Sequence, residues 1–225
     1  GVRYTEFSVL SNPAAPPGIS IGNIRRQAGR IVADLSAADR CWAGVIKEDA
    51  VWRDTVEVVG DVLVGKKASL MVLPGTVVRF GPDNLQMGLD PARSELTVEG
   101  KLLINQRVAG FDGVTIFTSA AVHPEPGDWY GIVAIGQAEI AIEDMRIEYP
   151  RIGLRGIDLR RRIETARLAV HDAAEYGIHV EPLRSEVYLT RLEVRRSGRS
   201  GVYAAGSSTV HLGKALLAAN AQYGL

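Results

Sequence analysis

The stretch AEYGIHV, residues 174–180, places a Tyr-Gly pair before an apolar, a polar and a second apolar residue. Close copies occur as DWYGIVA at 128–134 and AQYGL at 221–225, and looser copies as YPRIGLRG at 149–156 and SGRSGVYA at 197–204. Their glycines, at positions 131, 153, 177, 201 and 224, lie 22, 24, 24 and 23 residues apart. A repeat of this length is typical of a solenoid, in which successive coils of the chain stack on one another.

Each repeat contains two stretches in which apolar and polar residues alternate, one directly after the glycine and one further along. Alternation with frequent β-branched residues indicates strands, and no repeat shows the apolar spacing of a helix. Strands that recur once per coil pair in parallel, about 4.8 Å apart. The sequence therefore predicts an all-β solenoid, a parallel β-helix with 22 to 25 residues per coil.

Stacking of the coils predicts three interior columns of aliphatic side chains. They consist of Ile132, Leu154, Ile178 and Val202; of Ile140, Ile163, Val187 and Val210; and of Ile147, Val170, Val194 and Leu217. A β-sandwich also shows alternation, but it does not require the same content to return at a fixed interval along the chain. The regular spacing favours the β-helix.

The composition argues against several classes of function. Lysine plus arginine and aspartate plus glutamate number 26 each, so the net charge is zero and no positive excess favours nucleic acid. The single cysteine, Cys41, allows no disulfide within the chain. No apolar run is long enough for a membrane span. No His-Glu-x-x-His motif occurs, and neither a metal nor a cofactor is expected.

Residues 58–80, 96–104, 114–120 and 126–132 resemble the opening of a right-handed parallel β-helix region of secreted or surface bacterial proteins. The shared pattern runs from a Gly-Asp strand through a Pro-Gly-Thr turn and a Phe-Thr-Ser strand to a Gly-Asp-Trp block. The resemblance covers about 51–225 and implies a right-handed solenoid and a secreted or cell-surface location. The chain stops at YGL, where a new coil would begin, so we expect the β-helix to be truncated at its C-terminal end.

Residues 1–40 differ in composition, and GISIGNI at 18–24 and GRIVADLS at 29–36 are expected to form two strands joined by RRQA. They resemble the closing strands behind the catalytic domain of M6-type (immune inhibitor A-like) secreted metallopeptidases. The resemblance implies that 1–40 is the tail of a preceding β-rich domain, 41–50 a linker, and that further domains belong to the same polypeptide.

Two outward columns supply the candidate ligand-binding residues. The first, on the strands after the repeated glycines, contains Arg155, His179 and Tyr203; the second contains Arg167, Arg191 and Lys214 beside Asp144. A basic row could hold an anionic polysaccharide, and aromatic rings could stack on sugars. The alternative for both is a solvated surface with weak ion pairs. In the loop 81–93, Asp83, Asn84 and Asp90 could supply oxygens to calcium, although a plain loop is favoured.

The expected function is a non-catalytic extracellular scaffold or binding module, directed to a polysaccharide or cell-surface glycan. One alternative is a β-helix polysaccharide lyase or glycoside hydrolase, which would need a base with calcium-binding carboxylates or a pair of carboxylates. The outward columns contain no such cluster, and no catalytic residue is assigned. The other alternative is an accessory domain of a secreted metallopeptidase.

Overall fold

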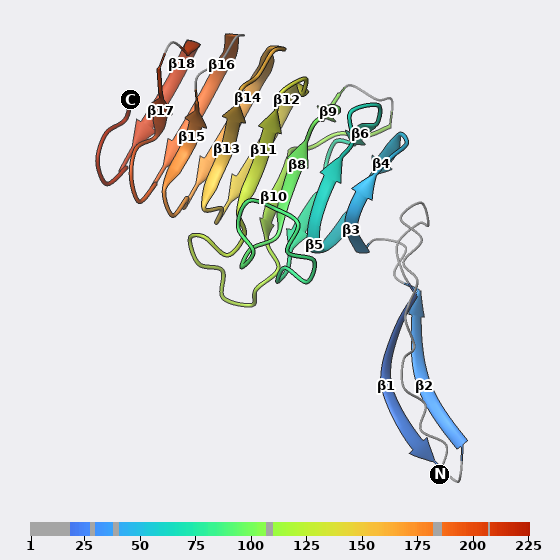
Figure 1. The fold of residues 1–225 in the computed structure, drawn as a ribbon. Helices are drawn as coiled ribbons and strands as arrows, with labels where there is room; N and C mark the ends of the chain where they lie inside the picture. The colour runs from blue at the N-terminus through green and yellow to red at the C-terminus, as the bar shows by residue number, and fades with distance from the viewer. Residues whose placement is uncertain (1–18, 28–29, 38–40, 107–109, 182–185, 207) are drawn as a thin grey trace.

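The computed structural model describes residues 19–27, 30–37, 41–106, 110–181, 186–206 and 208–225, and for 19–37 only the backbone. These residues form eighteen strands and no helix. A two-stranded antiparallel sheet joins β1 (Ile19–Gln27) to β2 (Arg30–Ala37). Two strands were expected here, but the expected connection RRQA is wrong, because Arg25, Arg26 and Gln27 lie in β1 and pair with β2. The other sixteen strands belong to one large sheet in which every pairing is parallel (Figure 1). The all-β prediction is confirmed.

The large sheet is a solenoid-like stack of coils with three ladders of parallel strands, here named A, B and C. Ladder A runs through β3 (Cys41–Ile46), the end of β5 (Thr55–Val64), β8 (Glu95–Val98), β11 (Gly131–Ile135), β13 (Ile152–Ile157), β15 (Tyr176–Val180) and β17 (Val202–Ala204). Ladder B runs through β4 (Ala50–Trp52), β6 (Ser69–Val72), β9 (Lys101–Ile104) and the first halves of β12 (Glu139–Glu148), β14 (Ile163–His171), β16 (Glu186–Arg195) and β18 (Thr209–Ala218). Ladder C runs through the start of β5, β7 (Val77–Phe80), β10 (Thr115–Ser119) and the second halves of the same four long strands.

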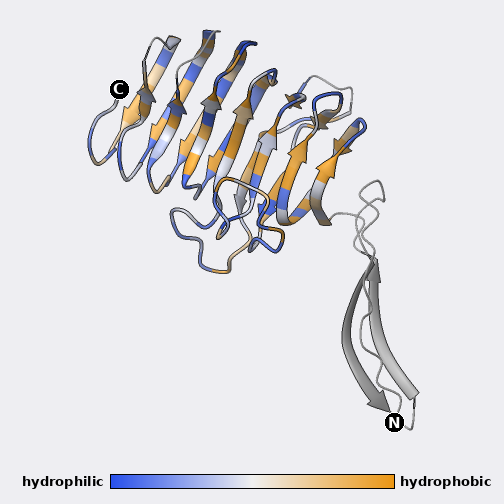
Figure 2. Ribbon diagram, in the orientation of Figure 1, coloured by the Kyte–Doolittle hydropathy of each residue, from blue (hydrophilic) through white to orange (hydrophobic). Residues whose placement is uncertain are grey.

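The three aliphatic columns predicted from the repeat are confirmed by the strand register. Ile132 pairs with Leu154, Leu154 with Ile178, and Ile178 with Val202; the other two columns pair in the same way. Their members are buried except Val210 and Leu217, which lie in the last strand and are partly exposed. Hydrophobic and hydrophilic residues alternate along the strands (Figure 2), and burial of the hydrophobic side chains inside the stack stabilises the fold.

The repeated glycines lie where the backbone of one coil contacts that of the next. A Cβ atom on Gly177 would stand 2.6 Å from the carbonyl oxygen of Gly201 and 2.4 Å from Cγ1 of Val194. Gly153 has the same surroundings one coil earlier. No side chain fits at such distances, and this explains why the phrase returns with its glycine in every coil.

Another column marks the turn that leaves ladder C. Its members are non-glycine residues with a left-handed backbone: Tyr149, Asp172, Arg196 and Ala219, with φ between 56° and 59°. Each of the first three donates its backbone N–H to a carbonyl oxygen of the next coil. Arg196 also donates from Nε and Nη2 to the carboxylate of Asp172, at 2.6 and 2.8 Å. Nothing in the sequence pattern had indicated this column.

Four aromatic side chains fill the interior of the early coils: Trp52, Phe80, Phe117 and Trp129. The rings of Phe80 and Trp129 stack at 3.9 Å with an interplanar angle of 9°, and Trp129 Nε1 donates to the carbonyl oxygen of Glu148 at 2.9 Å. Phe117 contacts both rings. The early coils are therefore packed around aromatic rings, and the later ones around aliphatic columns.

The coiled part begins earlier than the sequence predicts. Residues 41–46 lie within the stretch expected to be a linker, yet they form β3 and pair with β5 of the main sheet. Ile46 is buried, and Trp42 packs against Trp52 at 5.6 Å between ring centroids. These apolar contacts cover the first end of the stack. Among the described residues, no helix is long and apolar enough to cross a membrane.

Candidate functional site

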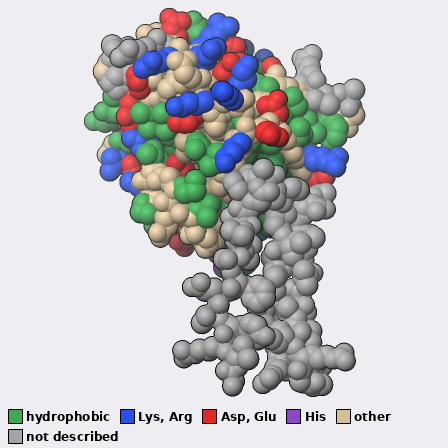
Figure 3. All heavy atoms as spheres, turned by 45° about the vertical axis from the view of Figure 1, so that its right-hand side comes forward, with side chains coloured by type: hydrophobic (Ala, Val, Ile, Leu, Met, Phe, Trp, Pro, Cys, Tyr) green, Lys and Arg blue, Asp and Glu red, His purple; other side chains and the backbone are tan. Residues whose placement is uncertain are grey.

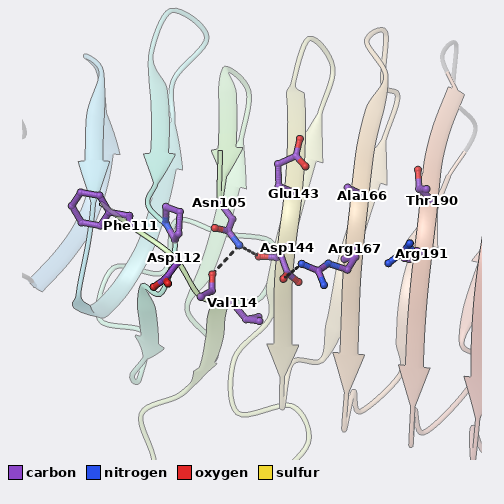
Figure 4. Close-up of a pocket in the computed structure, with 12 residues that line it drawn as sticks. Asn105, Phe111, Asp112, Val114, Glu143, Asp144, Ala166, Arg167, Thr190 and Arg191 are labelled. Carbon is purple, nitrogen blue, oxygen red and sulfur yellow. Dashed lines mark hydrogen bonds and ion pairs between the residues drawn. The ribbon is translucent and has the colours of Figure 1, made fainter. Parts of the chain in front are cut away.

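Two adjoining hollows, of about 800 and 410 Å³, follow the corner where ladder B turns into ladder C. Both are lined by Asp144, Arg167 and Arg191, and the smaller one extends to Lys214. Because they share these three residues, we call the two hollows together the corner groove; Figure 4 shows the residues that line the larger one. It contains the whole basic row that the sequence singled out, Arg167, Arg191 and Lys214, at equivalent positions of β14, β16 and β18.

The corner arises because each long strand bends in its middle. Alternation fails there, and two consecutive side chains point outward between buried neighbours: Glu143 and Asp144 in β12, or Thr190 and Arg191 in β16. In the coil before β12 the strand is instead interrupted between β9 and β10, and residues 111–114 of the intervening loop form a wall of the groove. The two coils before it are also interrupted at this corner, between β4 and β5 and between β6 and β7, but by shorter segments. The groove thus depends on the long loop between β9 and β10.

Asn105 fastens this wall to the stack. Its backbone is left-handed (φ 57°), and its side-chain amide donates to the carbonyl oxygens of Gly113 at 3.0 Å and Asp144 at 2.8 Å. Phe111, on the same wall, has 40% of its surface exposed and lines the larger hollow. The exposed ring had not been identified as a site residue. An aromatic residue in the glycine-rich stretch GFDG is the signal that could have revealed it.

Charges in the corner groove are unevenly matched. Arg167 Nη2 lies 2.6 Å from Asp144 Oδ2, and this ion pair joins equivalent positions of adjacent coils. No ion pair within the described ranges involves Arg191 or Lys214, and both side chains are exposed. On the face of the molecule that Figure 3 shows, basic and acidic side chains are interspersed. An anionic group in the groove would therefore meet two cations that have no internal partner.

The second candidate column lies on the outer face of ladder A. Arg155, His179 and Tyr203 are in register on β13, β15 and β17, as the sequence predicts. The His179 ring packs against Tyr176 and Tyr203, with centroids 5.0 and 5.1 Å away. Burial, together with the positive charge of Arg155, lowers the pKa of His179, so its imidazole is held neutral. His179 Nδ1 is buried and has no hydrogen-bond partner.

Arg155 itself is fully engaged by neighbours. Its Nε donates to Glu181 Oε1 at 2.9 Å, Nη2 contacts the same carboxylate, and Nη1 donates to the hydroxyl of Tyr130. The carboxylate of Glu181 is thereby committed to an ion pair and is not available as an acid or base. In the structure, this column on ladder A is a packed cluster of aromatic rings with one ion pair. Tyr203 is its most exposed ring.

Two buried carboxylates hold the loop 81–93 against ladder A. Asp61 accepts the backbone N–H groups of Met87 and Gly88 at 2.6 Å and of Glu95 at 3.0 Å. Glu95 accepts the N–H of Leu89 at 2.8 Å and the hydroxyl of Thr97. Burial raises the pKa of both carboxyl groups. The residue pattern did not indicate that these two acids are buried, because the loop that covers them has no regular alternation.

The three loop residues considered for calcium are occupied in other ways. Asp83 accepts the N–H groups of Leu85 and Gln86, and Asn84 donates to the carbonyl oxygen of Val59. Asp90 binds Arg93 and Arg151 at 2.8 and 2.9 Å. Over the described part of the chain, no group of three His, Cys, Asp or Glu side chains is placed to hold a metal ion.

Comparison with known proteins adds no relative. No family model, no curated protein and no solved structure matches the chain. The fold and the corner groove are therefore interpreted from their own geometry.

Proposed function

We propose that this chain is a secreted or surface-exposed right-handed parallel β-helix that acts as a non-catalytic binding module for an acidic glycan, which it holds in the corner groove. The proposal depends on one observation. Arg191 and Lys214 lie side by side in the groove, and neither forms an ion pair with an acidic side chain among the described residues. Exposed cations in a concave site attract carboxylate or sulfate groups, and an exposed ring such as Phe111 offers a stacking surface.

Handedness is supported by the order in which the chain visits the ladders. Each coil passes from A to B to C and returns to A, so successive strands of every ladder are joined by a crossover connection. Such connections between parallel strands are right-handed in about 98% of cases. The strands β1 and β2 are proposed to close a preceding domain of the same polypeptide, as in M6-type metallopeptidases, and the longer gene would test this by showing an upstream His-Glu-x-x-His.

A non-catalytic role fits the state of the carboxylates. Glycoside hydrolysis needs two carboxyl groups that can act on one sugar. On the outer face of ladder A, Glu181 is paired with Arg155, and in the groove Asp144 is paired with Arg167. The other two acids that line the larger hollow of the groove, Asp112 and Glu143, are exposed and lie on different elements, the wall loop and β12. Incubation of the chain with acidic and neutral polysaccharides, with and without calcium, is expected to release no oligosaccharide. Chain shortening would favour the lyase or hydrolase instead.

The binding function is tested by applying the purified 225-residue chain to an array of acidic and neutral glycans. Acidic glycans are expected to be retained and neutral ones not, with retention falling as salt rises because exposed charges are screened. The double variant Arg191→Gln/Lys214→Gln is expected to bind about ten-fold more weakly. Lys66→Gln/Lys67→Gln, which changes two exposed lysines outside the groove, is the matched control. Failure of every acidic glycan to bind, or equal loss in the control, contradicts the proposal.

A further inference from the structure

The smaller hollow of the corner groove contains one small side chain between two long charged ones. Two outward columns of ladder C line this hollow: the row of Asp144, Arg167, Arg191 and Lys214, and a second column of Arg146, Ala169, Glu193 and Leu216, two residues further along the same strands. Ala169 has the shortest side chain of the eight and lies in register between Arg146 and Glu193. The alanine therefore leaves room between an arginine and a glutamate.

Ion pairs direct the side chains of Arg146 and Glu193 away from the corner. Arg146 Nη1 lies 3.4 Å from Glu148 Oε1, and Glu193 Oε1 lies 3.0 Å from His171 Nε2. Glu148 and His171 pair with each other in the next outward column, which is further from the bend of the long strands. Arg146 and Glu193 thus flank the hollow of about 410 Å³, and Ala169 between them is partly exposed.

The two flanks of Ala169 have opposite hydrogen-bonding character. Arg146 lies one coil before it and Glu193 one coil after it, so their α-carbons are about 9.6 Å apart at the spacing of parallel strands. A guanidinium group only donates, through five N–H bonds, and an ionised carboxylate only accepts. Within the described ranges, the ion pairs of Arg146 involve Nη1 and those of Glu193 involve Oε1. A ligand group over Ala169 therefore meets donors on one side and an acceptor on the other.

An amide group matches this arrangement, whereas a charged group does not. A carboxylate over Ala169 would lie beside Glu193, and an ammonium group would lie beside Arg146, and like charges in contact are unfavourable. An N-acetyl group is neutral and carries a carbonyl acceptor, an N–H donor and an apolar methyl group. Ala169 and Leu216, of which Leu216 is 46% exposed, supply an apolar surface for that methyl group. A sugar hydroxyl has no apolar part to cover them.

We infer that the smaller hollow binds an acylamino group of the acidic glycan. The carbonyl oxygen of this group accepts a hydrogen bond from Arg146, its N–H donates to Glu193, and its methyl group lies on Ala169. The acidic group of the adjoining sugar binds Arg191 and Lys214. This inference rests on the proposed function and specifies the ligand class, a glycan in which an N-acylated amino sugar lies next to an acidic sugar.

The inference is tested with two ligands of equal charge that differ only in the acyl group: a hyaluronan octasaccharide and a derivative in which every N-acetyl group is replaced by N-pivaloyl. Titration calorimetry on the full chain is expected to show about three- to ten-fold weaker binding of the derivative, because the larger acyl group does not fit over Ala169. Ala169→Leu fills the hollow from the protein side and is expected to weaken binding of the hyaluronan octasaccharide by a similar factor. Ala141→Leu, at a partly exposed outward alanine of β12 outside the groove, is the matched control.

Dextran sulfate, which is acidic but has no amide group, separates this inference from the proposed function. Its binding is expected to be unchanged in Ala169→Leu and lost in Arg191→Gln/Lys214→Gln. Equal affinity of the two hyaluronan ligands for the unmodified chain excludes the acylamino subsite, and this comparison does not depend on the folding of any variant. Unchanged hyaluronan binding in Ala169→Leu, or binding of dextran sulfate without binding of hyaluronan, also excludes it and leaves the proposed function standing. Binding of no acidic ligand contradicts both.

Discussion

The α-carbon of Gly153 lies so close to the next coil that a Cβ atom on it would stand 2.4 Å from the carbonyl oxygen of Gly177. The same relationship links Gly177 to Gly201, at 2.6 Å, and Gly201 to Gly224, at 2.7 Å. The column of glycines is thus a seam along which backbones of successive coils touch directly.

Substitution in this seam tests the close approach. Gly177→Ala is expected to lower the free energy of unfolding by about 2–3 kcal/mol, because Cβ would overlap Val194 and the Gly201 carbonyl. Urea denaturation measures the change. Gly81→Ala is the control, since its Cβ would lie 3.4 Å from its nearest neighbour, an ordinary contact. Equal stability of wild type and Gly177→Ala would show that the coils are spaced more widely.

The left-handed column offers a stabilising change. Ala219 has φ of 56°, which costs an L-residue about 1–2 kcal/mol, whereas glycine adopts it freely. Ala219→Gly is therefore expected to raise the free energy of unfolding by about 0.5–1 kcal/mol, less than the full strain because glycine also loses more entropy.

Glycine at the preceding residue, Ala218, is expected to have the opposite effect on stability. Ala218 pairs with Arg195 in extended backbone, and Ala218→Gly is expected to destabilise by about 0.5–1 kcal/mol. A denaturation midpoint above that of wild type for Ala219→Gly, and below it for Ala218→Gly, supports the left-handed backbone at Ala219. A shift in the same direction for both contradicts it.

The buried acids beneath loop 81–93 predict a pH dependence of stability. Burial raises the pKa of Glu95 in the folded protein, so the folded state retains this proton over a range where the unfolded chain has lost it. The corresponding stability is present below the unfolded pKa, about 4.3, and is lost as pH rises through the folded pKa.

In the variant Glu95→Gln, the side chain stays neutral at every pH, so its stability does not fall when a buried carboxyl group would be deprotonated. The difference in unfolding free energy between Glu95→Gln and wild type is therefore expected to become more favourable to the variant between pH 4 and pH 7. Denaturant titrations across this range measure it, with Glu48→Gln as an exposed control. A constant difference for Glu95→Gln would mean that its carboxylate is not buried under the loop.

Alanine substitutions at Phe117 and Phe111 are expected to affect different properties, stability in the first case and glycan binding in the second. Phe117→Ala is expected to cost about 3–5 kcal/mol, because the ring is fully buried against Phe80 and Trp129. Phe111→Ala should change stability by less than about 0.5 kcal/mol, since the ring is exposed on the groove wall. It should nevertheless weaken binding of the acidic glycan by about three- to ten-fold. Unaltered affinity in Phe111→Ala would remove the ring from the site.

Much of the candidate site was visible as a pattern. Arg155, His179 and Tyr203 share one column because they occupy the same place after each repeated glycine, and parallel register follows from that periodicity. The pattern did not show that Arg155 is bound by Glu181 and Tyr130, because a strand register gives the face on which a side chain lies but not its conformation or its partners. It also assigned residues 41–46 to a linker, since a single terminal strand has no repeat to identify it.

Periodicity alone was enough for the interior of this protein: equal spacing forces equivalent residues into the same ladder, and aliphatic side chains at those positions leave water together. The corner groove could not be obtained in this way. It forms at the long loop between β9 and β10, which has no counterpart of equal length in the other coils. The shape of such an irregular segment depends on contacts with residues far along the chain, such as the hydrogen bond from Asn105 to Asp144. The local sequence therefore determines the strands and interior columns that recur in each coil. The irregular loop that forms the groove wall is determined by packing between segments far apart in the sequence.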